Sequence, residues 1–155
     1  MNRPVQWLIS IRPRLRWLFS GLLVVVMGAS GCNLPNFNPK LATSPYPYEL
    51  HTTNVLPIQV FRDGTHIEII NSTDLSWTDA TVWVNQRYSS TLKSLQPGQR
   101  VSMDLFSFRD DLGEQFRAGG LFRTRPAAKV ELIEIQSAEG MPMVGLISVM
   151  PGEGE

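Results

Sequence analysis

The densest group of recognition-type side chains combines four cations with two aromatic rings, placed around the Gly119-Gly120 pair. Its members are Arg117, Arg123, Arg125, Lys129, Phe116 and Phe122. Guanidinium groups bind phosphate and carboxylate through paired hydrogen bonds, so the group is a candidate anion-binding loop for an acidic polymer. The alternative is that the basic side chains extend over apolar surface with the phenylalanines docked beneath them, and we favour this second interpretation.

A second candidate site consists of Trp77, Trp83 and Tyr88. Trp83 stands between Val82 and Val84, so in a strand it points to the opposite face from both. Together the three rings could form a stacking platform for a sugar ring or a peptide. The competing expectation, which we favour, is that tryptophan in a two-sheet β-protein belongs to the core.

Catalytic motifs are missing from the sequence. It has no G-x-S-x-G elbow, no H-E-x-x-H pair and no phosphate-binding P-loop. Its two histidines are His51 and His66, and a catalytic triad would require one of them to meet an acid and a nucleophile through long-range folding. We therefore expect a protein that is not an enzyme.

Four acidic residues, Asp104, Asp110, Asp111 and Glu114, offer oxygen atoms of the kind that bind calcium. Their spacing does not match an EF-hand loop. We favour a solvated acidic loop, and so expect no metal site.

The start of the chain has the pattern of an export signal. Four arginines and no acidic residue precede an apolar core between Trp17 and Ala29, which is shorter than the roughly 20 residues of a membrane-spanning helix. The only cysteine of the chain, Cys32, follows two further small residues. The pattern favours a cleavable signal peptide over an uncleaved anchor.

The stretch Ala29-Ser30-Gly31-Cys32 resembles the lipobox of bacterial lipoproteins, with Ala29 where that family usually has leucine. The resemblance implies that residues 1–31 are a signal peptide and that Cys32 is acylated and becomes the new N-terminus. It places the protein in a bacterial cell envelope, with the membrane as a partner through the lipid on Cys32. Asn33 stands where inner-membrane lipoproteins often carry aspartate, which slightly favours the outer membrane.

Charge and cysteine content limit the remaining possibilities. The chain has 14 basic and 14 acidic residues, and removal of residues 1–31 takes away four arginines and leaves 10 basic residues. The mature protein is then mildly acidic, so we expect no nucleic-acid partner. With Cys32 acylated, the domain has no disulfide and no cofactor beyond that lipid.

Residues 32–54 predict a tether between the anchor and the domain. Pro35, Pro39, Pro45 and Pro47 lie there among asparagine, serine and threonine. Proline-rich segments are extended at about 3 Å per residue, so such a tether would hold the domain several tens of ångströms from a membrane. The domain itself should span residues 55–150, followed by a flexible acidic tail at 151–155.

The clearest local signal is a β-hairpin over residues 58–69, where alternating residues flank Asp63-Gly64, a pair typical of type I′ turns. This turn would place Val60 opposite Ile67, and the alternation places Ile58, Val60, Ile67 and Ile69 on the core face.

Further alternating runs predict strands at 80–84, 88–95, 101–105, 130–135 and 144–149. Pro97-Gly98 predicts a type II turn between two of them, and residues 107–127 predict a long loop or a short irregular helix. About seven short strands without helical periodicity indicate an all-β antiparallel sandwich.

The segment from Ile67 to Ile135 resembles the immunoglobulin-like domains attached to many bacterial envelope proteins. The residues that match are Asn71, Val82, Val84, Asn85, Leu95, Pro97, Gly98, Gln99, Val101 and Leu105. The resemblance implies an immunoglobulin-like sandwich, and because it consists of turn chemistry it indicates a fold and not an activity.

We therefore expect a lipid-anchored, non-catalytic envelope protein that acts as an interaction or assembly module with an envelope protein or polymer. The alternative is a ligand-binding lipoprotein that recognises an envelope polymer, a sugar or a peptide. An exposed concave surface bearing the three aromatic rings would favour the alternative, whereas a flat patch or a free edge strand would favour assembly.

Overall fold

The computed structural model describes residues 37–120 and 126–149. Cys32 and the predicted signal peptide lie outside these residues, as do Arg123, Arg125 and the predicted tail. Within the two described ranges, no helix has the length and apolar character that crossing a bilayer requires.

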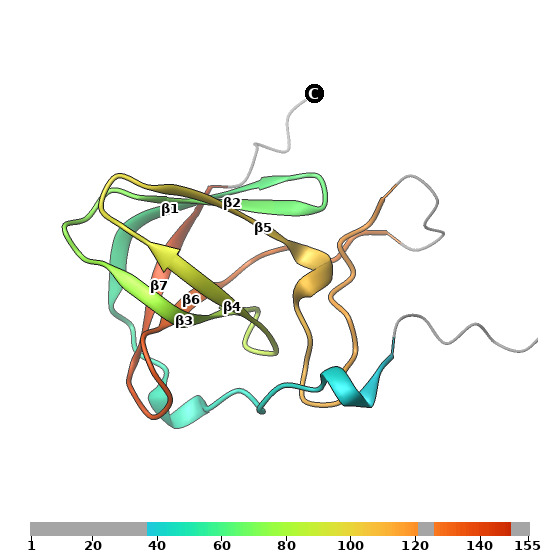
Figure 1. Ribbon diagram of the computed structural model, residues 1–155. Helices are drawn as coiled ribbons and strands as arrows, with labels where there is room; N and C mark the ends of the chain where they lie inside the picture. Colours follow the sequence, from blue (N-terminus) through green and yellow to red (C-terminus); the bar gives the residue numbers. More distant parts are fainter. Residues whose placement is uncertain (1–36, 121–125, 150–155) are drawn as a thin grey trace, which may run out of the picture. The chain divides into compact units, whose positions relative to one another are not determined.

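The domain is all-β, as predicted, with seven strands in one mixed sheet of order β4-β3-β6-β7-β1-β2-β5 (Figure 1). The strands are β1 (Val55–Asp63), β2 (His66–Asn71), β3 (Trp77–Val84), β4 (Tyr88–Leu95), β5 (Arg100–Asp104), β6 (Ile133–Gln136) and β7 (Met143–Val149). Three short 3₁₀ helices accompany them: η1 (Pro39–Leu41), η2 (Tyr48–Leu50) and η3 (Leu105–Ser107).

The sheet is not purely antiparallel, because β1 pairs in parallel with β7, while its other edge pairs antiparallel with β2. The edge strands β4 and β5 also contact each other, so the sheet curls into a nearly barrel-shaped body. The prediction of a purely antiparallel sandwich is therefore wrong in this pair, where the first and last strands of the chain meet.

The β1–β2 hairpin has the predicted core face but a different register. Asp63 pairs with His66 and Val60 with Ile69, so the loop consists of Gly64 and Thr65. Gly64 has φ +55° whereas Thr65 is not in the left-handed region, as in turns that need glycine only at the first central position. The predicted register is thus wrong by two residues. A shift of two preserves the side each residue faces, and Ile58, Val60, Ile67 and Ile69 are all buried.

The β4–β5 and β3–β4 turns contain the residues that the sequence singles out. Pro97-Gly98 forms the predicted turn, with Gly98 at φ +72° and the Gln99 N–H donating to the Gln96 carbonyl at 3.0 Å. In the β3–β4 turn, Asn85 has φ +54°, and its side-chain oxygen accepts from the backbone N–H groups of Glu131 and Leu132 at 2.8 and 3.2 Å. Asn85 therefore fixes this turn to the segment that enters β6.

The main core fills the inside of the curled sheet. It takes Ile58, Val60, Ile67 and Ile69 from the hairpin, Val82 and Val84 from β3, and Ile133 and Ile135 from β6. The described part of the predicted 107–127 loop is irregular beyond η3, and it adds Phe108 and Phe116 to the same core.

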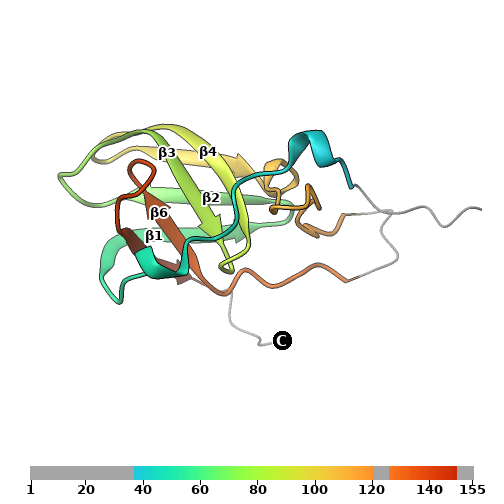
Figure 2. The same ribbon diagram turned by 90° about the horizontal axis from the view of Figure 1, so that it is seen from below.

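The predicted tether is not a free spacer over its described part. Residues 37–54, here called the N-terminal segment, lie across the sheet (Figure 2). The Thr43 N–H donates to the Asp110 carbonyl at 3.0 Å, the Thr52 hydroxyl to the Met143 carbonyl at 2.6 Å, and the Gly145 N–H to the Asn54 carbonyl at 2.8 Å. Local composition suggested a solvated spacer, but these long-range bonds make the segment part of the domain.

Candidate functional site

The N-terminal segment covers the face of the sheet that points away from the main core, called here the outer face. Strand pairing places Ser89 of β4, Trp83 of β3 and Glu134 of β6 in one row across this face. Thr91, Thr81 and Gln136 form the neighbouring row. Alternation along each strand sends the intervening Val82 and Ile135 inward.

A buried carboxylate fastens the segment to the first row. Glu134 is fully buried, accepts a hydrogen bond from the Tyr46 hydroxyl at 2.7 Å, and lies 2.7 Å from Nδ1 of His51. Burial, reinforced by the hydrogen bond with Glu134, raises the pKa of the Tyr46 hydroxyl above its ordinary value. A buried carboxyl group needs hydrogen-bond partners, and both partners here come from the segment.

A small second core lies beside this carboxylate. The Tyr46 and Trp83 rings meet edge to face with centroids 5.3 Å apart, and Met143 is buried against them. The Trp83 Nε1–H donates to the Gln136 side-chain oxygen at 3.3 Å, and the Gln136 amide nitrogen donates to the Met141 carbonyl at 2.9 Å. The indole and the amide are therefore positioned by the fold itself.

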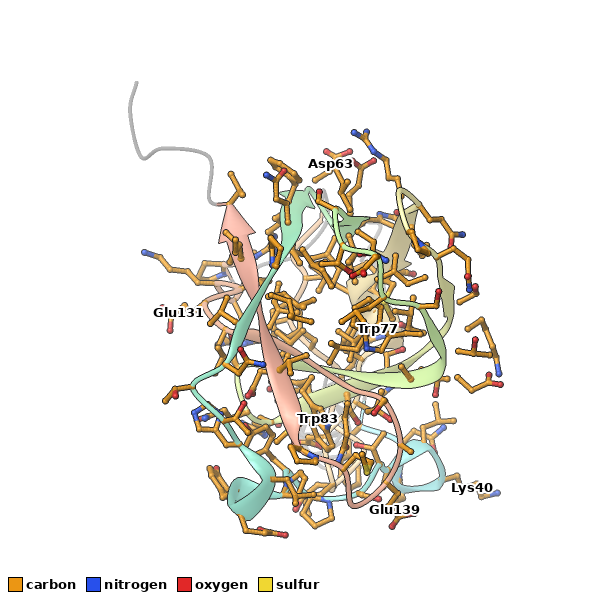
Figure 3. All side chains as sticks on the ribbon, turned by 90° about the vertical axis from the view of Figure 1, so that its left-hand side faces the viewer. Lys40, Asp63, Trp77, Trp83, Glu131 and Glu139 are labelled. Carbon is orange, nitrogen blue, oxygen red and sulfur yellow. The ribbon has the colours of Figure 1, made fainter. Side chains whose placement is uncertain are left out.

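Next to the second core lies a groove of about 620 Å³. Trp83, Thr81, Thr91 and Gln136 contribute to its lining from the outer face, Pro47 and Leu50 from the N-terminal segment, and Glu139 and Gly140 from the β6–β7 turn. Figure 3 shows Trp83 and Glu139 at the same end of the domain. Hydroxyl, amide and carboxylate groups beside an indole suit a polar ligand such as a sugar or an extended peptide.

The three aromatic rings are buried, as in the favoured core interpretation, and do not form an exposed platform. Trp77 and Tyr88 are 7% and 9% exposed and belong to the main core, whereas Trp83, 3% exposed, belongs to the second core. The three rings are thus buried in two separate clusters. Trp83 does point away from Val82 and Val84, as predicted, but Tyr46 covers it.

The predicted basic loop is described only at its two ends. Arg117 and Lys129 are exposed, and the Ala128 N–H donates to the Arg117 carbonyl at 2.8 Å. Arg62 of β1 donates to the carbonyls of Ala118 and Ala128, so it holds both ends of the loop together. Sequence reasoning missed this role of Arg62. A hollow of about 480 Å³ adjoins it, with Lys129 in its lining, and the anion-binding hypothesis for Arg117, Arg123, Arg125 and Lys129 stays a prediction.

Of the four acidic residues, Asp104 and Asp111 are exposed, as expected for a solvated loop, whereas Asp110 and Glu114 form an ion pair with Arg87. Asp110 is fully buried, and its Oδ2 accepts from Nε and NH2 of Arg87 at 3.0 and 2.7 Å. Its Oδ1 accepts the backbone N–H groups of Leu112 and Glu114. Burial raises the pKa of Asp110, but the bonds from Arg87 and the two N–H groups outweigh it and hold the pKa below its ordinary value.

The Arg87 contacts argue against a calcium site, because the guanidinium already binds an oxygen of Asp110 that a calcium ion would need. It also donates to Glu114 at 2.6 Å. Across the residues that the structure describes, no three histidine, cysteine, aspartate or glutamate side chains gather in a group that could hold a metal ion.

His51 does meet an acid through long-range folding, as a triad would require. Within the described chain, the His51 ring is hydrogen-bonded to Glu134 and to the Tyr46 hydroxyl, and the raised pKa of that hydroxyl makes it a poor nucleophile. The sequence signal for the cluster was faint. It consisted of Glu134 between two isoleucines in a predicted strand, together with Tyr46 and His51 in the proline-rich stretch.

Comparison with known proteins identified no relative of this chain. No protein-family model matches the chain, and no curated protein or solved structure matches it significantly.

Proposed function

We propose that the protein is a lipid-anchored component of a bacterial cell envelope that acts as a non-catalytic interaction or assembly module. Acylated Cys32 would attach it to the membrane, with the outer membrane favoured by Asn33. The arginine-rich start, the short apolar core and the small residues before the single cysteine support this proposal.

An immunoglobulin-like arrangement is part of the proposal. In such an arrangement, β4-β3-β6-β7 of the single sheet would form one layer and β1-β2-β5 the other, a four-plus-three grouping like that of seven-stranded immunoglobulin-like sandwiches. The pairing of β1 with β7 shifts register between Leu56 and Gln59, around Pro57. Such an irregularity lets one strand bend and serve both groups.

The observation that supports a binding role is the groove beside Trp83. Trp83 and Gln136 in its lining are positioned by hydrogen bonds within the domain. The N-terminal segment, which leads toward Cys32, forms one of its walls. A preformed groove with a few convergent polar groups is the usual form of a recognition site. The groove also gives specific support to the second candidate function, a ligand-binding lipoprotein for an envelope polymer, sugar or peptide.

Replacing Cys32 with serine should remove the anchor. The protein is then expected in the soluble fraction or as unprocessed precursor, because the serine hydroxyl cannot form the thioether to the lipid. Membrane fractionation, with intact-mass measurement of the parent protein, checks this. A parent protein with an unmodified Cys32 would contradict the proposal.

Partner binding in the groove can be tested by photocrosslinking in native membranes. A photoreactive amino acid in place of Thr91, which is exposed and lines the groove, should crosslink to an envelope component. The matched control is Thr78, another exposed strand threonine that does not line the groove. Equal crosslinking from the two positions, or crosslinking from Thr78 alone, would exclude the groove as the binding surface.

A further inference from the structure

Three large apolar side chains are exposed at the end of the domain where the described chain begins. Phe37, Leu41 and Leu112 are 54%, 49% and 60% exposed. They come from two segments that pair through the backbone, since Phe37 forms a β-bridge with Glu114 and the Asn38 N–H donates to the Gly113 carbonyl at 3.1 Å. We call these three residues the proximal patch.

The two segments that bear the proximal patch are fixed to each other. Gly113 has φ +82°, and a Cβ at this position would lie 2.1 Å from the Asn38 carbonyl oxygen. The Thr43 N–H donates to the Asp110 carbonyl, and Asp110 is itself held by Arg87. The fold therefore holds in place the two backbone segments that carry these residues, and exposed apolar patches are typical of interaction sites.

The length of chain before the patch indicates what covers it. Phe37 follows Cys32 by five residues, which span at most about 18 Å even when fully extended. If Cys32 is acylated, as proposed above, its acyl chains lie in the bilayer, so this end of the domain is confined to the membrane surface. Docking of the N-terminal segment excludes the longer spacing that a free tether would allow.

We propose that Phe37, Leu41 and Leu112 insert into the interfacial layer of the bilayer that holds acylated Cys32, so that the domain is seated on the membrane. Apolar side chains at this depth add to the affinity that the acyl chains provide. Lys40, exposed between Phe37 and Leu41, places a cation where anionic headgroups lie. The groove beside Trp83 would then have a defined orientation toward the membrane.

The test uses the full chain, processed in cells and reconstituted into vesicles of phosphatidylethanolamine and phosphatidylglycerol. In acylated protein the Cys32 sulfur is blocked, so Leu112→Cys introduces the only free thiol and accepts a nitroxide label there. The control is Met141→Cys in the β6–β7 turn, where Met141 is 50% exposed. Figures 1 and 2 show this turn at the left of the domain and η1 at its right.

Collision of the label with a water-soluble nickel chelate, measured by electron paramagnetic resonance, should be severalfold lower at position 112 than at 141. Equal collision rates in protein whose mass shows acylation would overturn the seating and leave the anchor intact. A free Cys32 thiol in the parent would instead overturn the anchoring proposal. Spin–spin broadening at position 112 would show that a second copy covers the patch, which also overturns the seating.

Circular dichroism of both labelled variants must match that of the parent. If Leu112→Cys disturbs the fold, Leu41→Cys makes the same measurement from the other paired segment, with the same expected and opposing results.

Discussion

Arg87→Ala should lower the free energy of unfolding by about 3 kcal/mol, toward the low end of the cost of removing one partner from a buried ion pair. The fully buried Asp110 would keep its two backbone N–H donors but lose its counter-charge. The low end is appropriate because the Arg87 side chain is itself half exposed. Urea denaturation of the chain from Asn33 onward measures the effect.

The loss should also depend on pH. In the parent, the pKa of Asp110 lies below its ordinary value, so this carboxylate stabilises the fold above about pH 4 and ceases to do so as the pH falls through its lower folded pKa. Without Arg87, burial favours the protonated acid. The difference between parent and variant should therefore be largest near neutral pH and shrink in acid.

Lys93→Ala is the matched control, because Lys93 forms an ion pair with Asp79 in which both side chains are largely exposed. Such pairs contribute about 0–1 kcal/mol. If Arg87→Ala costs no more than Lys93→Ala at neutral pH, Asp110 is not buried in solution as described.

Trp83→Ala should lower the free energy of unfolding by about 3–5 kcal/mol, the range for removing a buried tryptophan. It empties the second core, leaving Tyr46 and Met143 without their main partner. It also removes the indole from the lining of the groove. Circular dichroism during urea denaturation measures the change.

Tyr48→Ala is the control, since Tyr48 also contacts the Tyr46 ring, at 4.8 Å, but is 69% exposed. Its effect should stay within about 0.5 kcal/mol, as for most surface substitutions. A parent-like midpoint for Trp83→Ala would mean that the N-terminal segment does not pack on Trp83 in solution.

The outcome for Trp83 and Glu134 shows which part of this fold can be predicted from sequence. Alternation correctly placed Trp83 opposite Val82, because the side that a residue faces is a local property of a strand. What covers that side is not local. Tyr46 and His51 reach Glu134 across more than 80 residues of sequence, and the proline content of their segment suggested a solvated spacer.

In the β1–β2 hairpin, too, the local features could be predicted from sequence but the strand register could not. Asp63-Gly64 located the turn, and the isoleucine and valine pattern located the core face. The register depends on which residues occupy the two central positions, and glycine suits more than one turn type. For Trp77, Trp83 and Tyr88, ring type alone did not separate recognition from burial, and the favoured core interpretation is the one that the structure supports.

The pairing of β1 with β7 has a consequence for how the protein is made. Val55 is opposite Gly145, so the first strand finds one of its partners only when nearly the whole chain is available. Contacts between distant residues close large loops and form slowly. A chain emerging from its N-terminus therefore cannot complete its sheet until β7 has been synthesised. Until then β1 can pair only with β2, and its edge toward β7 stays unpaired.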